Sequence, residues 1–137
     1  MSLLGRLGGY PGVAGVLVVS YPVLASAARN VATAGRYCTR PRKVGIARLN
    51  REVLTISRVI VHPIYRGLGL ATRLVGDVLA RLDAPLVEAF ARMGAIVPFF
   101  KRAGMNELRL EGRPVYYWRD GAGQLTRPSD ATRGATP

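Results

Sequence analysis

The sequence is poor in the side chains that bind metals or form disulfides. Its 137 residues include one cysteine, Cys38, and one histidine, His62. A single thiol cannot form an internal disulfide or a thiolate cluster, and a single imidazole has no second histidine to complete a zinc site. We therefore expect no metal centre, and we expect Cys38 to be an ordinary thiol.

Long hydrophobic runs are also missing. The longest apolar run, residues 13–19, is much shorter than the roughly 20 residues of a membrane-spanning helix. Glycines and a proline interrupt the first 15 residues, which do not resemble a signal peptide. Hydrophobic residues still make up 49% of the chain, and its mean hydropathy is +0.15. We expect one folded cytoplasmic domain with no membrane contact.

Acidic residues are scarce. There are 8 Asp and Glu against 20 Lys and Arg, so the formal net charge is +12 and the pI is about 11.2. A positive field attracts polyanions, and arginine binds phosphates and guanine edges with two hydrogen bonds. The densest positive cluster is a predicted loop over residues 37–43 that contains Arg40, Arg42 and Lys43. It indicates either a DNA or RNA partner or a solvated surface loop in an arginine-rich chain.

The most informative segment is a glycine-spaced loop that follows a run of β-branched residues. It consists of Arg66, Gly67, Leu68, Gly69, Leu70, Ala71 and Thr72. Hydrophobic periodicity predicts a helix over residues 69–82, and the N–H groups at the start of a helix bind anions, which glycines allow to approach closely. The spacing matches neither a P-loop nor a Rossmann fingerprint. It predicts a site for a diphosphate-bearing cofactor.

This loop resembles the Arg/Gln-x-x-Gly-x-Gly/Ala signature of the GNAT superfamily of N-acetyltransferases. Val61-His62-Pro63 is similar to the Val-x-Pro that ends the strand before that signature, and residues 98–105 resemble the family's Phe-Tyr-x-Lys-x-Gly-Phe helix ending. The resemblance implies an α/β (α+β) fold with a mixed, mostly antiparallel sheet flanked by helices. It also implies acetyl-CoA or another acyl-CoA as the donor, and an amine as the acceptor.

Three more stretches, residues 49–52, 56–63 and 87–94, resemble a GNAT subgroup that is appended to ABC-type ATPases and is related to the phage DNA-modification protein Mom. That resemblance covers residues 13–105 and implies an adenine amine in DNA as the acceptor, and an ATPase or a second copy of the chain as a partner. The alternative is a catalytically weak GNAT-shaped module that binds nucleic acid or protein.

The remaining patterns predict the order of the elements. Strands are expected at residues 13–21, 44–49, 53–61 and 85–90, a second helix at 95–103, a hairpin at 107–118, and a short helix or ordered loop at 24–35. We expect a flexible lead-in over 1–12, a GNAT-like domain over 13–119 and a disordered basic tail over 120–137. GNAT proteins normally begin with a strand and two helices that form part of the acceptor wall. With this shortened N-terminal part, residues 24–35 or a partner subunit would have to supply that wall, or the chain is a truncated form.

The family resemblance also implies roles for individual residues. The thioester oxygen would accept a hydrogen bond from a backbone N–H of the strand holding Val59, Ile60 and Val61. Many relatives place a tyrosine general acid where this chain has Phe100, which cannot donate a proton.

Candidates for proton transfer are therefore Glu88, Ser57 and His62. Each has an alternative role: Glu88 would form an ion pair with Arg58 or Arg92, and His62 would stabilise the turn. Ser57 and Arg58 would either contact the acceptor or the cofactor phosphates, or lie on the strand surface. The aromatic run Tyr116-Tyr117-Trp118 is interpreted as core packing or as a platform for a base.

Overall fold

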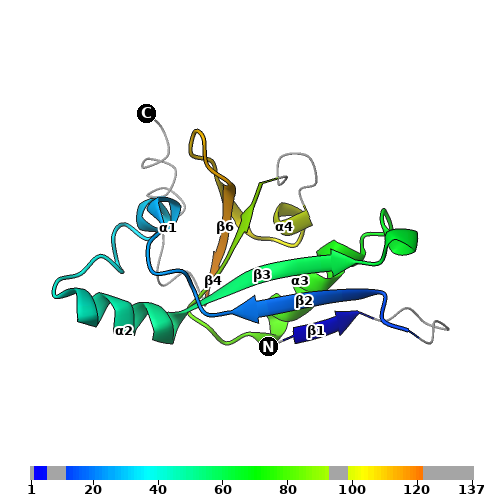
Figure 1. Ribbon diagram of the computed structural model, residues 1–137, viewed down its shortest axis with the longest axis horizontal. Helices are drawn as coiled ribbons and strands as arrows, with labels where there is room; N and C mark the ends of the chain where they lie inside the picture. Colours follow the sequence, from blue (N-terminus) through cyan, green and yellow to red (C-terminus); the bar gives the residue numbers. More distant parts are fainter. Residues whose placement is uncertain (1, 6–11, 93–98, 122–137) are drawn as a thin grey trace.

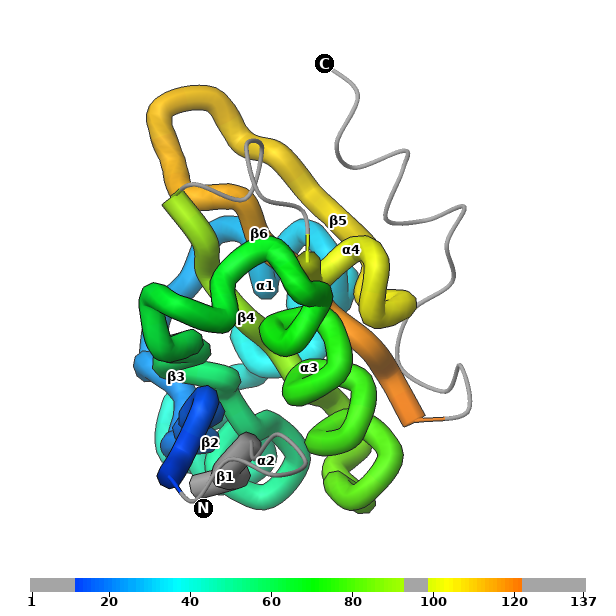
Figure 2. The backbone as a smooth tube through the Cα atoms, turned by 90° about the vertical axis from the view of Figure 1, so that its right-hand side faces the viewer, coloured from blue at the N-terminus to red at the C-terminus, as the bar shows by residue number. Residues whose placement is uncertain are grey.

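The structure is a computed structural model that describes residues 2–5, 12–92 and 99–121. Within these residues one sheet has the strand order β1-β2-β3-β4-β6-β5, with helices packed on both of its faces (Figures 1 and 2). The strands are β1 (Ser2–Gly5), β2 (Gly15–Ser20), β3 (Val53–Val61), β4 (Leu86–Ala91), β5 (Asn106–Leu108) and β6 (Val115–Asp120). The helices are α1 (Ala27–Ala32), α2 (Arg42–Glu52), the 3-10 helix η1 (Pro63–Tyr65), α3 (Leu70–Arg81) and α4 (Phe99–Arg102).

The sheet is mixed and mostly antiparallel, as predicted. Its one parallel pair is β3 with β4, and this pairing extends only from Val53 opposite Leu86 to Ile56 opposite Ala89. Beyond Ile56, β3 continues to Val61 along β2, while β4 runs beside β6. Figure 1 shows the two strands separating from this point. The sheet therefore opens between β3 and β4 on the side where α3 begins.

A β-bulge lies where β3 leaves β4. Across the β2–β3 pair, Val18 lies opposite Arg58 and Val19 opposite Ile56, so Ser57 has no partner in the ladder. The Ser57 hydroxyl donates to the carbonyl oxygen of Val18 at 3.2 Å. The bulge leaves the side chains of Ser57 and Arg58 exposed.

Two apolar clusters fill the two faces of the sheet. The larger cluster lies under α3 and α4 and includes Leu74, Val78 and Phe100. The smaller cluster lies under α1 and α2 and includes Leu49, Tyr116 and Trp118. Alternate residues of the central strands contribute to opposite clusters because side-chain direction alternates along a strand. In α3 the predicted face is buried, with Leu70, Leu74, Val75, Val78 and Leu79 inside.

The strand predicted at residues 44–49 is wrong, because this segment belongs to helix α2. Its buried residues are Gly45 and Leu49, one helical turn apart, while Val44 is 47% exposed. A Cβ on Gly45 would lie 2.7 Å from the carbonyl oxygen of Tyr37, so the helix packs closely against the preceding loop. A short apolar run does not distinguish a strand from a helix by periodicity alone.

The N-terminal segment also differs from the expectation. Residues 2–5 are not a flexible lead-in, because they form strand β1, which pairs antiparallel with β2. Backbone pairing of this kind carries little sequence signature in a glycine-rich segment. Residues 120–137 were expected to be a disordered tail, and those beyond 121 lie outside the described residues.

The other predicted elements are present. Strands β2 and β3 form within the predicted residues 13–21 and 53–61, and the short helix α1 forms within 24–35. Strand β4, predicted at 85–90, begins and ends one residue later. The predicted hairpin is the antiparallel pair β5–β6. Of the helix expected at 95–103, α4 covers Phe99–Arg102, and residues 95–98 lie outside the described residues. No helix among the described residues is long and apolar enough to cross a membrane.

Candidate functional site

The glycine loop lies between the end of β3 and the start of α3. Its two glycines have positive φ angles, +85° at Gly67 and +75° at Gly69, a conformation that side chains with a Cβ rarely adopt. No heavy atom lies within 4 Å of the position that a Cβ would take on either glycine. The loop thus turns its bare backbone toward open space.

The backbone hydrogen bonds among the described residues leave most N–H groups of this loop unused. The first hydrogen bond of α3 runs from Arg73 N to Gly69 O at 3.1 Å, so the N–H groups of residues 70–72 precede the helical ladder. The hydrogen bonds that the described residues form outside helices and strands do not use the N–H groups of residues 67–69 either. Six successive N–H groups therefore lie at the positive end of a 12-residue helix.

Local hydrogen bonds hold the turn that leads into this loop. The Nδ1 atom of His62 accepts from Ile64 N at 3.3 Å, which places the proton of a neutral imidazole on Nε2. The His62 ring also lies 5.6 Å from the Tyr65 ring, centre to centre. Arg66 is exposed, and its Nε donates to the carbonyl oxygen of Val61 at 3.4 Å. These contacts keep Arg66 beside the opening between β3 and β4.

The pairing of β3 with β2 determines which of its N–H groups face that opening. His62 N donates to Ala14 O at 2.7 Å, and N–H direction alternates along a regular strand. The N–H of Ile60 therefore points into β2, opposite Val16. The N–H groups of Val59 and Val61 point the other way, toward the side that β4 has left. Of the three strand residues singled out in the sequence, Val59 and Val61 therefore direct their N–H groups toward the opening, and Ile60 does not.

Glu88 lies in the centre of the sheet, and its carboxylate accepts four hydrogen bonds. Its carboxylate accepts from Arg29 Nε at 2.8 Å and from Arg29 Nη2 at 2.7 Å. It also accepts from the Thr55 hydroxyl at 2.9 Å and from the Tyr116 hydroxyl at 2.7 Å. Four donors use the four lone-pair positions of a carboxylate. This arrangement favours a structural role for Glu88 over the predicted role as a base.

The partner predicted for Glu88 is wrong. The sequence indicated Arg58 or Arg92, whereas the ion pair is made by Arg29. Arg29 lies on α1, whose place on the sheet could not be read from its alanine-rich sequence. The available sequence signal was an arginine three residues after Ser26 in a mostly apolar segment. That signal is weak, because arginine is rarely buried.

Burial and charge shift the pKa values of Tyr116 and Arg29. Burial raises the pKa of Tyr116 well above its usual range, and the negative charge of Glu88 raises it further. Burial alone would lower the pKa of Arg29, but its hydrogen bonds and attraction to Glu88 outweigh that effect, and the pKa is raised. At neutral pH Tyr116 is therefore a neutral phenol and Arg29 is a cation.

The aromatic residues singled out in the sequence are part of the core. Tyr116, Tyr117 and Trp118 are buried, so they form core packing and no platform for a base. Phe100 is also buried, with its ring centre 5.2 Å from that of Tyr117 and 4.5 Å from that of Phe99. Phe100 thus completes the apolar cluster beneath α3.

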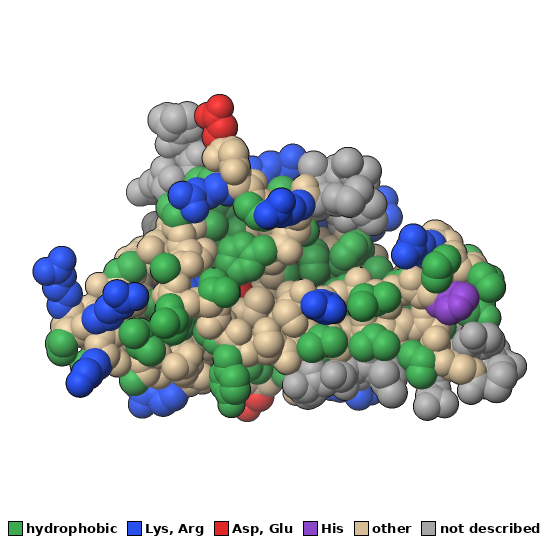
Figure 3. All heavy atoms as spheres, in the orientation of Figure 1, with side chains coloured by type: hydrophobic (Ala, Val, Ile, Leu, Met, Phe, Trp, Pro, Cys, Tyr) green, Lys and Arg blue, Asp and Glu red, His purple; other side chains and the backbone are tan. Residues whose placement is uncertain are grey.

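The basic residues do not gather around the glycine loop. Arg40, Arg42 and Lys43 are exposed at the start of α2, and Lys and Arg side chains are visible on that end of the molecule in Figure 3. The nine residues of β3 separate the end of α2 from the loop by roughly 30 Å. Arg58, in contrast, lies at the bulge where the sheet opens.

Comparison with solved structures shows the same fold. An acetyltransferase from Thermus thermophilus is 18% identical, with a TM-score of 0.52, and the match covers 88% of this chain and 63% of that one. A protein assigned to the GNAT family from Desulfovibrio desulfuricans is 14% identical (TM-score 0.52, 87% and 67%). A protein assigned as arylalkylamine N-acetyltransferase 7 from the yellow fever mosquito is 20% identical (TM-score 0.55, 88% and 64%).

These identities are low, so the likeness establishes the fold and nothing finer. The chain has a GNAT fold, and it spans about two thirds of the length of the structures it matches. Searches with protein-family models and of curated protein sequences found no match.

Proposed function

We propose that the protein is an acyl-CoA-dependent N-acyltransferase and that the diphosphate of its donor binds the N–H groups of residues 67–72. The observation that carries this proposal is the run of N–H groups at the start of α3, most of which form no hydrogen bond among the described residues. Backbone N–H groups converging at a helix N-terminus bind phosphates. The open space next to Gly67 and Gly69 is the room that the phosphate oxygens need.

The separation of β3 from β4 fits the rest of such a donor. From the diphosphate, its extended arm would run along β3 and meet the N–H groups of Val59 and Val61. Bound acyl-CoA would supply a thioester. The acceptor nitrogen would bond to its acyl carbon as the C–S bond breaks, and the proton that the nitrogen loses would balance the one that the leaving thiolate takes up. The strand holds this arm in place, and an N–H directed at the thioester oxygen stabilises the charge that develops there.

The two remaining candidates for proton transfer, Ser57 and His62, lie at different distances from the proposed acyl group. Ser57 and His62 are five residues apart, which is roughly 16 Å along a strand. His62 therefore lies at the diphosphate end, where its contacts with Ile64 and Tyr65 stabilise the turn. Ser57, at the bulge, lies at the acyl end of the arm. We assign any side-chain contribution to proton transfer to Ser57, because the carboxylate of Glu88 is occupied.

A second candidate acceptor, the amine of a nucleic-acid base predicted from the sequence, is favoured by two observations. The net charge is +12, and Arg58 is exposed at the acyl end of β3. Affinity for duplex DNA that falls steeply with salt, and that decreases in Arg58→Gln, would support it. Affinity that is independent of salt, or an unchanged affinity in Arg58→Gln, would remove DNA from the proposal.

Thermal unfolding with and without acetyl-CoA tests the proposed function directly. A ligand that binds only the folded state raises stability by RT ln(1 + [L]/Kd), or about 2.7 kcal/mol at a concentration of 100 Kd. We expect a rise in Tm with acetyl-CoA and with CoA, which share the diphosphate, and none with pantetheine, which lacks it. An unchanged Tm at millimolar acetyl-CoA would overturn the proposal.

A further inference from the structure

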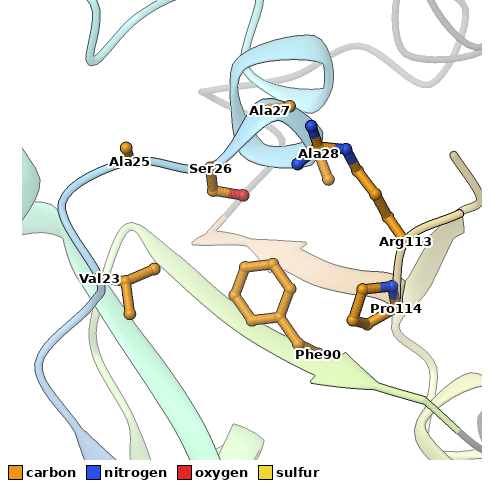
Figure 4. A pocket seen from close by; sticks show the side chains of 8 residues that line it. All are labelled: Val23, Ala25, Ser26, Ala27, Ala28, Phe90, Arg113 and Pro114. Carbon is orange, nitrogen blue, oxygen red and sulfur yellow. The ribbon is translucent and has the colours of Figure 1, made fainter.

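A pocket of about 270 Å³ opens between α1, β4 and the β5–β6 turn. Figure 4 shows the Phe90 ring at its centre, with α1 on one side and the β5–β6 turn on the other. Its lining includes Val23, Ala25, Ser26, Phe90, Arg113 and Pro114. The cavity lies on the face of the sheet that carries α1, which is opposite the face that carries α3.

The pocket adjoins the opening in the sheet. Phe90 follows Ala89, the last residue of β4 that pairs with β3, so its side chain lies where the two strands separate. Helix α1 forms one wall of the pocket. Two buried hydrogen bonds from Arg29 on α1 to Glu88 on β4 hold this wall in place. A molecule in this pocket would therefore lie next to the acyl end of the proposed donor site and against a fixed wall.

The polar groups of the pocket are hydrogen-bond donors. Arg113 is exposed, and none of the ion pairs formed among the described residues involves it. The Ser26 oxygen accepts from Arg29 N at 3.2 Å, so its own O–H remains able to donate. In Figure 4 the Ser26 hydroxyl points into the pocket, and the Arg113 guanidinium lies beside α1. Two donors, one of them a cation, suit an anionic group such as a carboxylate or a phosphate.

The rest of the lining is apolar, and it lacks a carboxylate. Val23, Phe90 and Pro114 offer surface for a planar or aliphatic body, while nothing in the lining pairs with an ammonium group. The amine of a molecule bound here would therefore lie outside this lining, and the opening between β3 and β4 begins next to Phe90. At about 270 Å³, the cavity is slightly smaller than the usual range for drug-sized ligands, which suits a molecule with one ring.

We propose that this pocket binds the acceptor, and that the acceptor is a small primary amine with an apolar body and an anionic group at the end remote from the amine. This inference rests on the proposed function, because it assigns the second substrate of the same site. Arg113 binds the anion, Phe90 packs against the apolar body, and the amine extends toward the acyl group.

Isothermal titration calorimetry with three matched probes tests the pocket without any acyl-CoA. The probes are para-(aminomethyl)benzoate, para-toluate, which lacks the amine, and benzylamine, which lacks the carboxylate. We expect the two carboxylates to bind at least tenfold more tightly than benzylamine. Arg113→Gln should remove that difference, whereas Arg109→Gln, an exposed arginine of the same hairpin outside the pocket, should retain it.

A second variant guards against an effect of Arg113 on folding. Ala25 is exposed and lines the pocket, so Ala25→Trp should fill the cavity with little cost to the fold and abolish binding of both carboxylates. Equal affinity for all three probes, or unchanged binding in both pocket variants, would overturn the proposal.

Release of free thiol from acetyl-CoA then tests the acceptor role. We expect release with para-(aminomethyl)benzoate and a KM for that amine at least tenfold higher in Arg113→Gln, with the effect of acetyl-CoA on Tm unchanged. Probe binding without any transfer, in a protein that does bind acetyl-CoA, would overturn the acceptor assignment. If acetyl-CoA does not bind, the proposed function fails while the calorimetry still decides what the pocket binds.

Discussion

Arg29 and Glu88 form a two-pronged ion pair in the centre of the protein, with donor distances of 2.8 and 2.7 Å. They are 59 positions apart in the sequence, and their side chains are 1% and 0% exposed. The pair joins α1 to β4. Because α1 forms one wall of the pocket and β4 one side of the sheet opening, this contact positions the two proposed substrate sites relative to each other.

Breaking this pair should be costly. Arg29→Met leaves a buried carboxylate without its cation, and removal of one partner of a buried pair typically costs about 3–5 kcal/mol. Arg29→Met combined with Glu88→Gln should cost less than the sum of the two single changes, since it leaves no unpaired charge. Urea unfolding measures these free energies. Arg36→Met is the control: the Arg36–Glu52 pair is 37% and 19% exposed and should cost about 1 kcal/mol or less.

Gly69→Ala should separate ligand binding from stability. The φ of Gly69 is +75°, so alanine strains the backbone by roughly 1–2 kcal/mol and places a methyl group where the diphosphate is proposed to bind. Gly35 has a φ of +76° and, like Gly69, no heavy atom near its Cβ position. Both variants should lose similar stability in urea, but only Gly69→Ala should lose the rise in Tm with acetyl-CoA. An equal rise in the two variants would place the diphosphate elsewhere.

Arg66→Glu should weaken acetyl-CoA binding through charge. Arg66 lies at the loop, next to the Val61 carbonyl, so a carboxylate there repels the phosphates and costs at least tenfold in affinity. Arg81→Glu makes the same charge change at the other end of α3, about 18 Å away at 1.5 Å per residue. Calorimetric titration of both variants measures the difference. Similar losses in the two would attribute the effect to net charge alone.

Acid should destabilise the contact between α2 and the preceding loop. The hydrogen bond from Arg36 lowers the pKa of Glu52 below its usual value near 4.5, although burial opposes this effect. Tyr37 also donates to Glu52, at 3.0 Å. A lowered pKa contributes stability that is fully present above the unfolded-state value and is lost as the pH falls through the folded-state value.

The difference in Tm between the wild type and Glu52→Gln measures this contribution. We expect the wild type to be the more stable protein at pH 7, and the difference to shrink as the pH falls below about 4.5. Glu111→Gln is the control, since Glu111 is exposed in the β5–β6 turn. A difference that stays constant from pH 7 to pH 3 would contradict the role assigned to the Arg36–Glu52 pair.

The sequence alone predicted the elements whose signals are local. A run of β-branched residues indicated β3, apolar residues four apart indicated α3, and glycines at the turn indicated backbone that only glycine adopts easily. The boundaries of β3 agree with the prediction to the residue. The candidate anion site could be located for the same reason, since it consists of consecutive backbone groups between two such elements.

Only the tertiary structure decided the rest. Residues 44–49 are a short, mostly apolar run that fits a strand or a helix, and the contacts of Gly45 and Leu49 decided for the helix. The partner of Glu88 came from a segment 59 positions away, and no local pattern encodes such a distance. The pocket likewise combines α1, β4 and the β5–β6 turn. Local geometry is encoded in neighbouring residues, whereas side chains from distant segments meet only once the sheet has brought them together.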